Sequence, residues 1–300
     1  MGTTRIKQVG IYVGKHFRLF VNERGWKVII FAAIIATLIS SVLGSNMFVY
    51  DYDTFTGSFT LVSACIWIGI FNSIQSICKE RAIIKREHRT GLHISSYIIS
   101  HMIYQAVICV IEAIVILIIS AFFIKYPSGN SLFLHTYVEF FITYFLLLYS
   151  SDILGIAVSS IVKTPATAMT VMPFVLIIQL VFSGMLFTLS GPVSYLSDIT
   201  LSKWGLNASC ISADYNNLEK SEKLKMESYL KRAVKNQNLT ISDEAVTKII
   251  DSAYGEGSIN PTYEYTLGNL FSNWGILCIH ILVYGAFSII ALEFIDKDKR

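Results

Sequence analysis

Charged residues that interrupt long apolar runs are the part of this sequence best suited to chemistry. The densest group is the segment 79–93, KERAIIKREHRTGLH, which holds five Lys or Arg and two Glu in fifteen residues. A bilayer core would accept such a segment only at high cost, so it must lie in water at a membrane face. We therefore treat it as the segment around which the rest of the chain is arranged.

Two acidic residues stand inside apolar runs, where an ionised group is costly and usually faces the protein interior. Glu112 lies in the middle of one run, and Asp152 lies toward the cytoplasmic part of the next. They could belong to a proton path, or they could form structural hydrogen bonds between helices. The neighbouring runs offer no Lys or Arg to pair with them, which favours the structural role.

No catalytic or metal-binding pattern accompanies these residues. The six His include no close pair of the HxxxH kind, and four of the five Cys lie in or beside apolar runs, where Cys packs as a small apolar residue. Cys210 is expected on the outer side, either as a free thiol or bridged to a second copy. Gly14-Lys15-His16 lacks the earlier glycine and the hydroxyl residue of a phosphate-binding loop. We expect no enzyme activity, metal or cofactor on this chain itself.

The composition is that of a membrane protein. The chain is 53% hydrophobic and 15% charged, with a mean hydropathy of +0.56. Its apolar residues gather into runs of about 20, the length that spans a bilayer. We predict an all-α polytopic membrane protein in contact with lipid, and the small net charge of +3 gives no indication of a nucleic-acid partner.

The distribution of positive charge predicts the orientation. Six Lys or Arg precede the first apolar run, none lies in the loop after it, and five lie in 79–93. Because positive residues gather in cytoplasmic loops, both termini and 79–93 are expected in the cytoplasm of a cell with this protein in its plasma membrane. The six runs expected to cross the membrane are 28–44, 58–78, 95–124, 132–162, 166–189 and 267–295.

Four stretches make up the expected organisation, with a soluble character only in the third. Within that stretch, 192–204 suits a re-entrant hairpin, and 222–234 and 242–254 are expected to form two short helices over the outer mouth. The stretches are 1–27, an amphipathic connecting helix; 28–190, five transmembrane helices with the charged segment; 191–266, the re-entrant segment and outer loop; and 267–300, the sixth helix and a cytoplasmic tail.

The amphipathic character of 1–27 comes from apolar residues at three- and four-residue spacing. They are Ile6, Val9, Val13, Phe17 and Phe20. Such a helix either lies at the membrane surface or packs on a partner protein, and one helix can do both.

Two stretches resemble a known family of membrane proteins. ERAIIKREHRTGLHISSY, with Glu80-Arg81, Arg86-Glu87, Gly91 and Tyr97, is similar to the segment after the second span of ABC type-2 exporters of the G-subfamily. SGMLFTLSGPVSYLSDITLSKWGLNA resembles the end of span five and the re-entrant region of the same family. Both occur in the family's order, so the resemblance covers most of the chain.

The resemblance implies roles for particular residues. Glu80, Arg81, Arg86 and Glu87 match the coupling helix, which in that family contacts the ATPase and transmits its closure to the spans; the alternative is a plain stop-transfer cluster. Any of the other matched residues could instead pack against lipid or another helix. The matches to the central cavity are Cys65, Ile68, Asn72, Leu176 and Leu180, and the matches to the apolar gate at its outer end are Met185 and Leu186.

Partners follow from the same resemblance. The family pattern implies a dimer, formed with a second copy or a related permease, and two ATPase copies that bind ATP and Mg²⁺. Because the chain starts just before the amphipathic helix, we expect a separate ATPase subunit, as in a bacterial system. The implied function is export of a hydrophobic or amphipathic substrate, such as a lipid, a drug-like compound or a peptide, by alternating access.

Two other functions fit the residues. The chain could be an ion-coupled transporter that uses Glu112 and Asp152 and needs no ATPase. It could also be a membrane sensor or immunity protein whose outer segment binds a ligand without transport.

Overall fold

The computed structural model describes residues 4–127, 131–185, 187, 191–218, 226, 229–230 and 260–297. Over these residues the chain is helical and contains no strand, which confirms the predicted all-α class. The two helices expected in 222–234 and 242–254 fall almost entirely outside the described residues.

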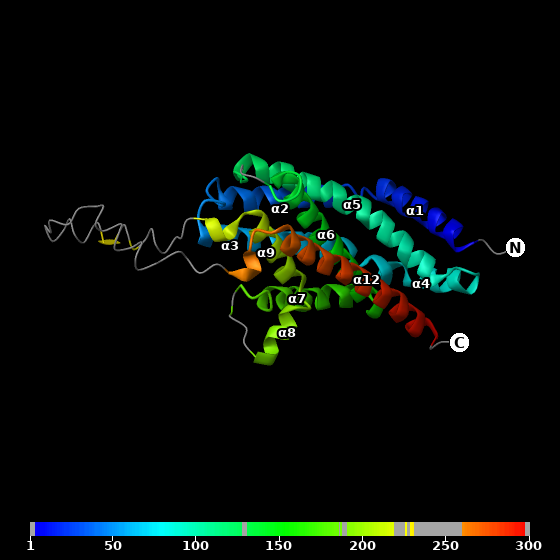
Figure 1. Cartoon of the computed structure of the whole chain (residues 1–300). Helices are drawn as coiled ribbons and strands as arrows, with labels where there is room; N and C mark the ends of the chain where they lie inside the picture. Colours follow the sequence, from blue (N-terminus) through cyan, green and yellow to red (C-terminus); the bar gives the residue numbers. More distant parts are fainter. Residues whose placement is uncertain are drawn as a thin grey trace, which may run out of the picture.

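The helices follow one another with short connections (Figure 1). In chain order they are α1 (Arg5–Asn22), α2 (Lys27–Leu43), α3 (Asp51–Ser73), α4 (Ser76–Arg89), α5 (Ile94–Phe123), α6 (Thr136–Ile161), α7 (Pro165–Val181), η1 (Gly191–Val193), α8 (Ser194–Ser197), α9 (Leu201–Ser212), η2 (Tyr215–Asn217), η3 (Pro261–Tyr263) and α12 (Leu267–Lys297).

Among the described residues, four helical segments are long and apolar enough to cross a membrane. A bent pair, α1 with α2, makes a fifth candidate with a bend of 69°, and α7 is a shorter apolar helix of 17 residues. The protein is therefore a multi-pass membrane protein, and the count of six crossings stays a prediction. The four segments are Asp51–Arg89, Ile94–Phe123, Thr136–Ile161 and Leu267–Phe294.

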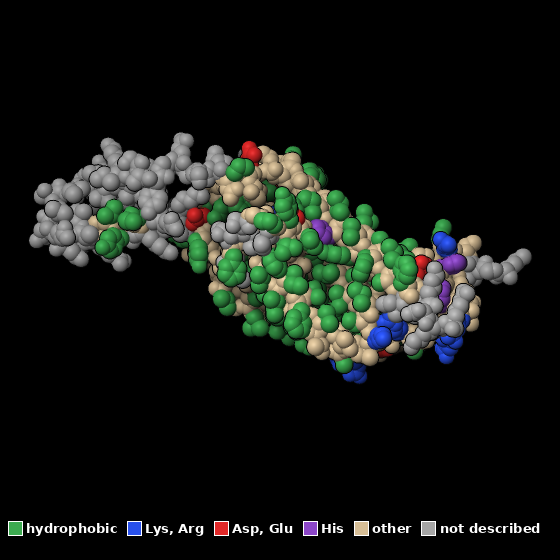
Figure 2. Space-filling model, turned by 90° about the horizontal axis from the view of Figure 1, so that it is seen from below, with side chains coloured by type: hydrophobic (Ala, Val, Ile, Leu, Met, Phe, Trp, Pro, Cys, Tyr) green, Lys and Arg blue, Asp and Glu red, His purple; other side chains and the backbone are tan. Residues whose placement is uncertain are grey.

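Helix α6 lies at the centre of the bundle, where it packs against α3, α5, α9 and α12. The start of α1, all of α4 and the end of α12 lie at the same end of the molecule (Figure 1). Figure 2 shows a face that is mostly hydrophobic over its middle, with Lys and Arg gathered toward one end. That distribution suits a body in lipid with a charged end in water.

Glycine allows the closest approach in the bundle, between α3 and α6. A Cβ added at Gly69 would collide with the Ser151 hydroxyl and the Leu148 carbonyl oxygen, and one added at Gly155 would collide with the Ser73 hydroxyl. Small residues at helix interfaces in membranes let backbones come this close, and van der Waals packing then holds the helices together. The seam between α3 and α6 therefore depends on one glycine from each helix.

Several helix bounds become clear only in the structure. Asp51 and Asp53 lie in the first turn of α3, where negative charge suits the positive end of the helix dipole. The charged helix begins at Ser76 and ends at Arg89, and Gly91, with φ of 108°, makes the turn into α5. The stretch 192–204 holds parts of η1 and α9 and all of α8, and α9 continues to Ser212; its re-entrant character stays a prediction.

The structure also shows the surroundings of Cys210. It lies on α9, which is packed among α3, α6 and α12, and it is fully buried with a free thiol. A buried thiol is out of reach of a second copy, so the bridge considered for this residue does not fit the folded chain.

Replacing Gly69 by Ala is expected to destabilise the protein by about 1–3 kcal/mol, the usual cost of overpacking. Gly275→Ala on α12 is the matched control, since a Cβ there meets nothing within 4 Å. Thermal unfolding in detergent measures both. Equal thermal midpoints for the two variants would contradict the close packing of α3 against α6 at Gly69.

Candidate functional site

The beginning of α4 is held by α6. The first backbone N–H groups of a helix have no partner within it. Here the amides of Ile77 and Cys78 both donate to Oγ of Ser159, each at 3.1 Å. A side chain of α6 therefore caps the start of α4.

Arg81 makes the reciprocal contact. Its guanidinium donates to the carbonyl oxygens of Val162 and Ser160, the latter at 3.2 Å, at the end of α6. The last carbonyls of a helix lack internal partners and carry partial negative charge, so a cation is favoured there. Arg81 thus joins the two helices through the end of α6.

Glu80 and Glu87 attach the other side of α4 to α1 and α5. Oε2 of Glu80 accepts from Nζ of Lys15 on α1 at 3.2 Å and from Oη of Tyr97 on α5 at 2.9 Å. Oε2 of Glu87 accepts from Oη of Tyr12 on α1 at 2.7 Å. Burial, and then the bond to Glu87, raise the pKa of Tyr12, so its phenol remains a donor.

Gln8 completes the attachment of α1. Its Nε2 donates to the Gly91 carbonyl at 3.0 Å, and its Oε1 accepts from the His93 amide at 3.1 Å. Both groups belong to the turn between α4 and α5. Because Gln8, Tyr12 and Lys15 recur at helical spacing, one face of α1 contacts α4 and its turn along their length.

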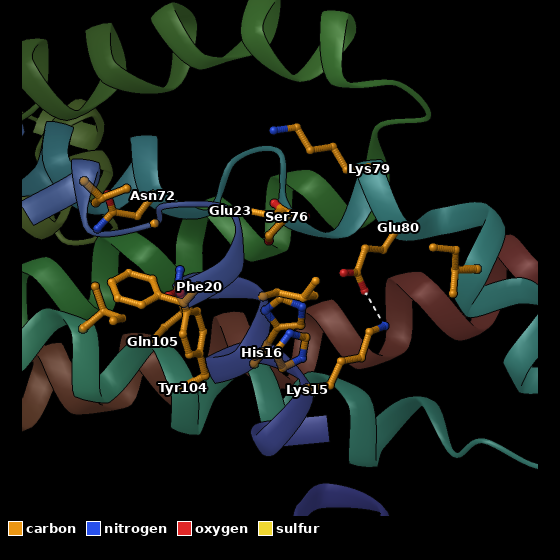
Figure 3. A pocket seen from close by; sticks show the side chains of 16 residues that line it. Lys15, His16, Phe20, Glu23, Asn72, Ser76, Lys79, Glu80, Tyr104 and Gln105 are labelled. Atoms are coloured by element: carbon orange, nitrogen blue, oxygen red, sulfur yellow. Dashed lines mark hydrogen bonds and ion pairs between the residues drawn. The ribbon is translucent and has the colours of Figure 1, made fainter. Parts of the chain in front are cut away.

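The opposite face of α4 is free within the described structure. Its exposed residues, spaced by four and three positions, are Ala82, Arg86 and Arg89. This face is mainly basic, which suits contact with another protein. Lys79 and Ile83 are also exposed, but they line a cavity together with residues of α1 (Figure 3).

We call the contacts that attach α4 to α1, α5 and α6 the clamp. His16 on α1 lies next to the clamp and is buried against α5. Its ring centroid is 3.9 Å from that of His101, and its Nε2 is 3.4 Å from Oγ of Ser100. Burial lowers the pKa of His16 to about 4, with Lys15 acting in the same direction and Glu80 against it. The ring is therefore neutral near pH 7.

The two intramembrane carboxylates each bind an amide side chain on another helix. Both oxygens of Glu112 on α5 accept from Nδ2 of Asn72 on α3, at 3.0 and 2.9 Å. Oδ1 of Asp152 on α6 accepts from Nε2 of Gln105 on α5 at 3.0 Å. These contacts join α3, α5 and α6, and the structural role of the two acids stays a prediction.

Comparison with known proteins decides the family. The profile described as ABC-2 type transporter matches residues 8–212, which run from α1 to the end of α9. The chain belongs to the ABC-2 type transporter family. It is also 26% identical, over 224 residues, to the ABC transporter ATP-binding/permease protein Rv1747 of Mycobacterium tuberculosis. That alignment covers 71% of this chain but only 26% of the relative, so the chain spans about a quarter of the relative's length.

Within the ABC-2 fold, the residues predicted for coupling separate into two groups. Glu80, Arg81 and Glu87 point into the clamp and bind α1, α5 and α6, whereas Arg86 lies on the free face. The sequence pattern did not indicate this division. Their action on an ATPase stays a prediction.

The residues predicted for the cavity are also placed. Cys65, Ile68 and Leu176 are buried inside this single ABC-2 chain, and Asn72 binds Glu112. Leu180, with the proposed gate residue Met185, packs against a small cluster of Phe59, Leu206 and Cys210. Leu186 lies outside the described residues. The cavity assignment therefore stays a prediction.

Several residues of the clamp were not singled out in the sequence. Gln8, Tyr12 and Ser159 are polar residues on helices whose apolar pattern drew attention first, and Tyr97 entered only through the resemblance. The signal that could have found the first two is their spacing from Lys15, by which all three share one face of α1. Among the described residues, no group of three or more His, Cys, Asp or Glu could hold a metal.

The lowered pKa of His16 predicts that stability falls in acid. Between about pH 6.5, the ordinary pKa of histidine, and pH 4, the unfolded chain binds more protons at this residue than the folded chain does. The stability that the neutral His16 ring contributes to the folded chain is therefore complete above this window, and it is lost as pH falls through it. Lys15, Glu80, Tyr97, His101 and Tyr104 are the charged or titratable groups around the ring.

The measurement is the thermal midpoint at pH 7 and pH 5 for the native protein and for His16→Gln, which keeps a donor for Ser100 but does not titrate. The native protein is expected to lose more stability than the variant. Equal losses would show that His16 does not titrate differently in the folded chain.

Proposed function

We propose that this chain is the membrane subunit of an ATP-driven exporter and that α4 carries the motion of the ATPase to the spans. The observation that carries the proposal is the double attachment of α4, to α6 through Arg81 and Ser159 and to α1 and α5 through Glu80. A helix held on both sides cannot move without its neighbours. A push on α4 would therefore act on the bundle as a rigid-body displacement.

The free face of α4 is the surface proposed for the ATPase. Arg86 and Arg89 give it positive charge, and Ala82 adds a small apolar contact. The Mycobacterium tuberculosis relative is named as an ATP-binding/permease protein, which joins the two functions. In the proposal ATP and Mg²⁺ bind to that partner, and α4 receives only its movement.

A second copy of this chain, or a related permease, would complete the substrate path. α7 has exposed apolar side chains at Phe174, Ile177 and Ile178, and α3 adds Trp67 and Phe71. Such surfaces suit an interface within the membrane and a hydrophobic or amphipathic substrate, such as a lipid, a drug-like compound or a peptide. Opening of α7 away from α3 would expose the predicted cavity residues and alternate access outward.

The proposed orientation has both termini and α4 in the cytoplasm. The ion-coupled alternative finds less support, because Glu112 and Asp152 are each bound to an amide that fixes them between helices. A sensor without transport would give α4 no reason to be held on both sides.

The first test is purification of the chain from its native membrane in mild detergent, with co-purifying proteins identified by mass spectrometry. A stoichiometric ATPase is the expected result. Its absence from a complex kept intact, together with cargo movement that responds to an uncoupler instead of to ATP, would replace this proposal with the ion-coupled one.

Two pairs of substitutions on α4 are expected to fail in different ways. Glu80→Ala with Arg81→Ala removes the clamp, so the ATPase should still bind and hydrolyse ATP, but the spans should not respond. Arg86→Ala with Arg89→Ala changes the free face, so ATPase binding itself should weaken by about tenfold or more.

The response of the spans is measured as the change in labelling, on adding ATP, of a single cysteine introduced as Leu180→Cys in a chain whose native cysteines are replaced. The clamp pair should abolish the ATP-dependent change while co-purification is preserved. If the Glu80→Ala, Arg81→Ala variant responds to ATP as the native chain does, α4 does not transmit the motion of the ATPase to the spans.

A further inference from the structure

Helix α7 contacts the rest of the chain through one narrow stripe of side chains. Its buried residues are Ala168, Met172, Leu176 and Gln179, spaced by four, four and three positions, while other faces carry exposed apolar residues such as Phe174. Inside a membrane, an apolar side chain gains little by leaving lipid for a neighbouring helix, because lipid tails are equally apolar. The apolar part of the stripe therefore fixes α7 only weakly, and Gln179 is the polar residue in it.

The start of α9 lacks a cap of its own. The first N–H groups of a helix need acceptors from outside that helix. Thr200 stands at the N-cap position, but its side chain makes no capping bond, and its hydroxyl donates to the Ser197 carbonyl at 2.7 Å. The acceptor comes from α7, where Oε1 of Gln179 accepts from the Leu201 amide at 2.8 Å and from the Ser202 amide at 3.4 Å. Gln179 thus takes the place of the missing cap.

A bond in the other direction satisfies the end of α7. The last carbonyl groups of a helix have no partner within it, and Gln179 lies shortly before α7 ends at Val181. Oγ of Ser202 donates to the backbone carbonyl oxygen of Gln179. Leu201, Ser202 and Gln179 are all buried, so water does not replace these bonds when they break. The end of α7 and the start of α9 therefore stay together unless several buried groups lose their partners at once.

Helix α9 is itself fixed to the body of the protein. It packs among α3, α6 and α12, and every residue of α9 except Lys203 and Trp204 is buried. A Cβ added at Gly205 would collide with the Leu147 side chain of α6, so these two helices are in close contact. The bonds of Gln179 consequently join the weakly packed α7 to an element that is held on several sides.

The residues that follow Gln179 belong to a small apolar cluster, separate from the main core. Leu180 and Met185 pack there against Phe59 of α3 and Leu206 of α9. Met185 is the predicted gate residue, so parting of this cluster would open the proposed path at its outer end. Because Leu180 follows Gln179 directly in the last turn of α7, it is held in the cluster as long as Gln179 stays bound to α9.

We propose that Gln179 is the positioning residue that keeps the outer gate closed, because its side chain fixes the end of α7 to α9 and so holds Leu180 and Met185 on the apolar cluster. The inference rests on the proposed function for the meaning of the gate, and it adds the hydrogen bonds that must break before the gate opens. Hydrogen bonds suit this role because they weaken steeply with angle and distance, whereas apolar contact is non-directional.

The test is the rate at which a water-soluble maleimide labels Met185→Cys in membranes without ATP, in a full chain whose native cysteines are replaced by Ala. Gln179→Met keeps the approximate length of the side chain but removes its acceptor oxygen. We expect it to raise the labelling rate by about tenfold or more, since two buried amides lose their partner in the closed state. An unchanged labelling rate overturns the proposal.

Two further variants separate the hydrogen bond from other effects of the substitution. Gln179→Glu keeps an acceptor oxygen and loses only Nε2, which makes no hydrogen bond within the described part of the chain, so its labelling rate should stay close to the native one. Gln75→Met is the matched control, because Gln75 occupies the N-cap position of α4 without a capping side-chain bond. Labelling of Gln179→Glu as fast as that of Gln179→Met would show that the acceptor does not close the gate.

A second labelling position distinguishes release of α7 from loosening of α9. Ala213 follows α9 directly, belongs to the main core and is 1% exposed. Ala213→Cys should stay protected from the maleimide in the Gln179→Met background, because only α7 is released there. Equal increases at Met185→Cys and Ala213→Cys would show that the substitution loosens α9 itself, and the assignment of Gln179 to the gate would be wrong.

A milder variant decides the question if Gln179→Met does not reach the membrane. Ser202→Ala removes only the donor to the Gln179 carbonyl, so it should raise the labelling rate of Met185→Cys by a smaller factor, and a native rate would count against the proposal. None of these measurements involves ATP. Native labelling of Gln179→Met in a chain that still co-purifies with an ATPase would remove this inference alone, whereas absence of an ATPase would remove the proposed function and leave the labelling result to stand by itself.

Discussion

Backbone groups at helix ends need hydrogen-bond partners, and this constraint organises the end of the molecule that carries α4. The start of α4 and the end of α6 meet there, and each would leave unpaired groups where water is scarce. Ser159 and Arg81 satisfy them reciprocally, one from each helix. An unsatisfied buried group costs about 1–3 kcal/mol, so the two ends stay together unless both sets of bonds break. The position of α4 therefore follows from the need to give the last carbonyl groups of α6 hydrogen-bond donors.

The seam between α3 and α6 extends this connection into the membrane. Gly69 and Gly155 bring the two backbones close, and Ser73 donates to the Asp152 carbonyl at 2.6 Å across the same seam. α4 follows α3 directly in the chain and also contacts the end of α6. A displacement of α4 is thus constrained by the same two helices through chain connection, capping and packing. This is the physical reason why a short charged helix can act on long apolar ones.

The sequence was sufficient to predict the helical class and the membrane location, because apolar runs and charge counts depend only on composition and order. It also located the charged helix to within a few residues. It could not divide Glu80, Arg81 and Glu87 from Arg86, because that division depends on which neighbours α4 packs against. It did not reveal that Cys210 is buried, since nothing in the short, moderately apolar stretch of α9 shows that three other helices surround it. Local pattern predicts elements, whereas the partners of a side chain depend on the tertiary arrangement.

A hydrogen-bonded chain joins α5, α4 and α1. Nε2 of His101 lies 3.0 Å from Oη of Tyr97 on α5, that hydroxyl donates to Glu80 on α4, and Glu80 also accepts from Lys15 on α1. Tyr97 is fully buried, so a movement of α4 that separated Glu80 from it would leave a buried hydroxyl without its acceptor, at a cost of about 1–3 kcal/mol. One carboxylate of α4 therefore holds this helix to both α1 and α5.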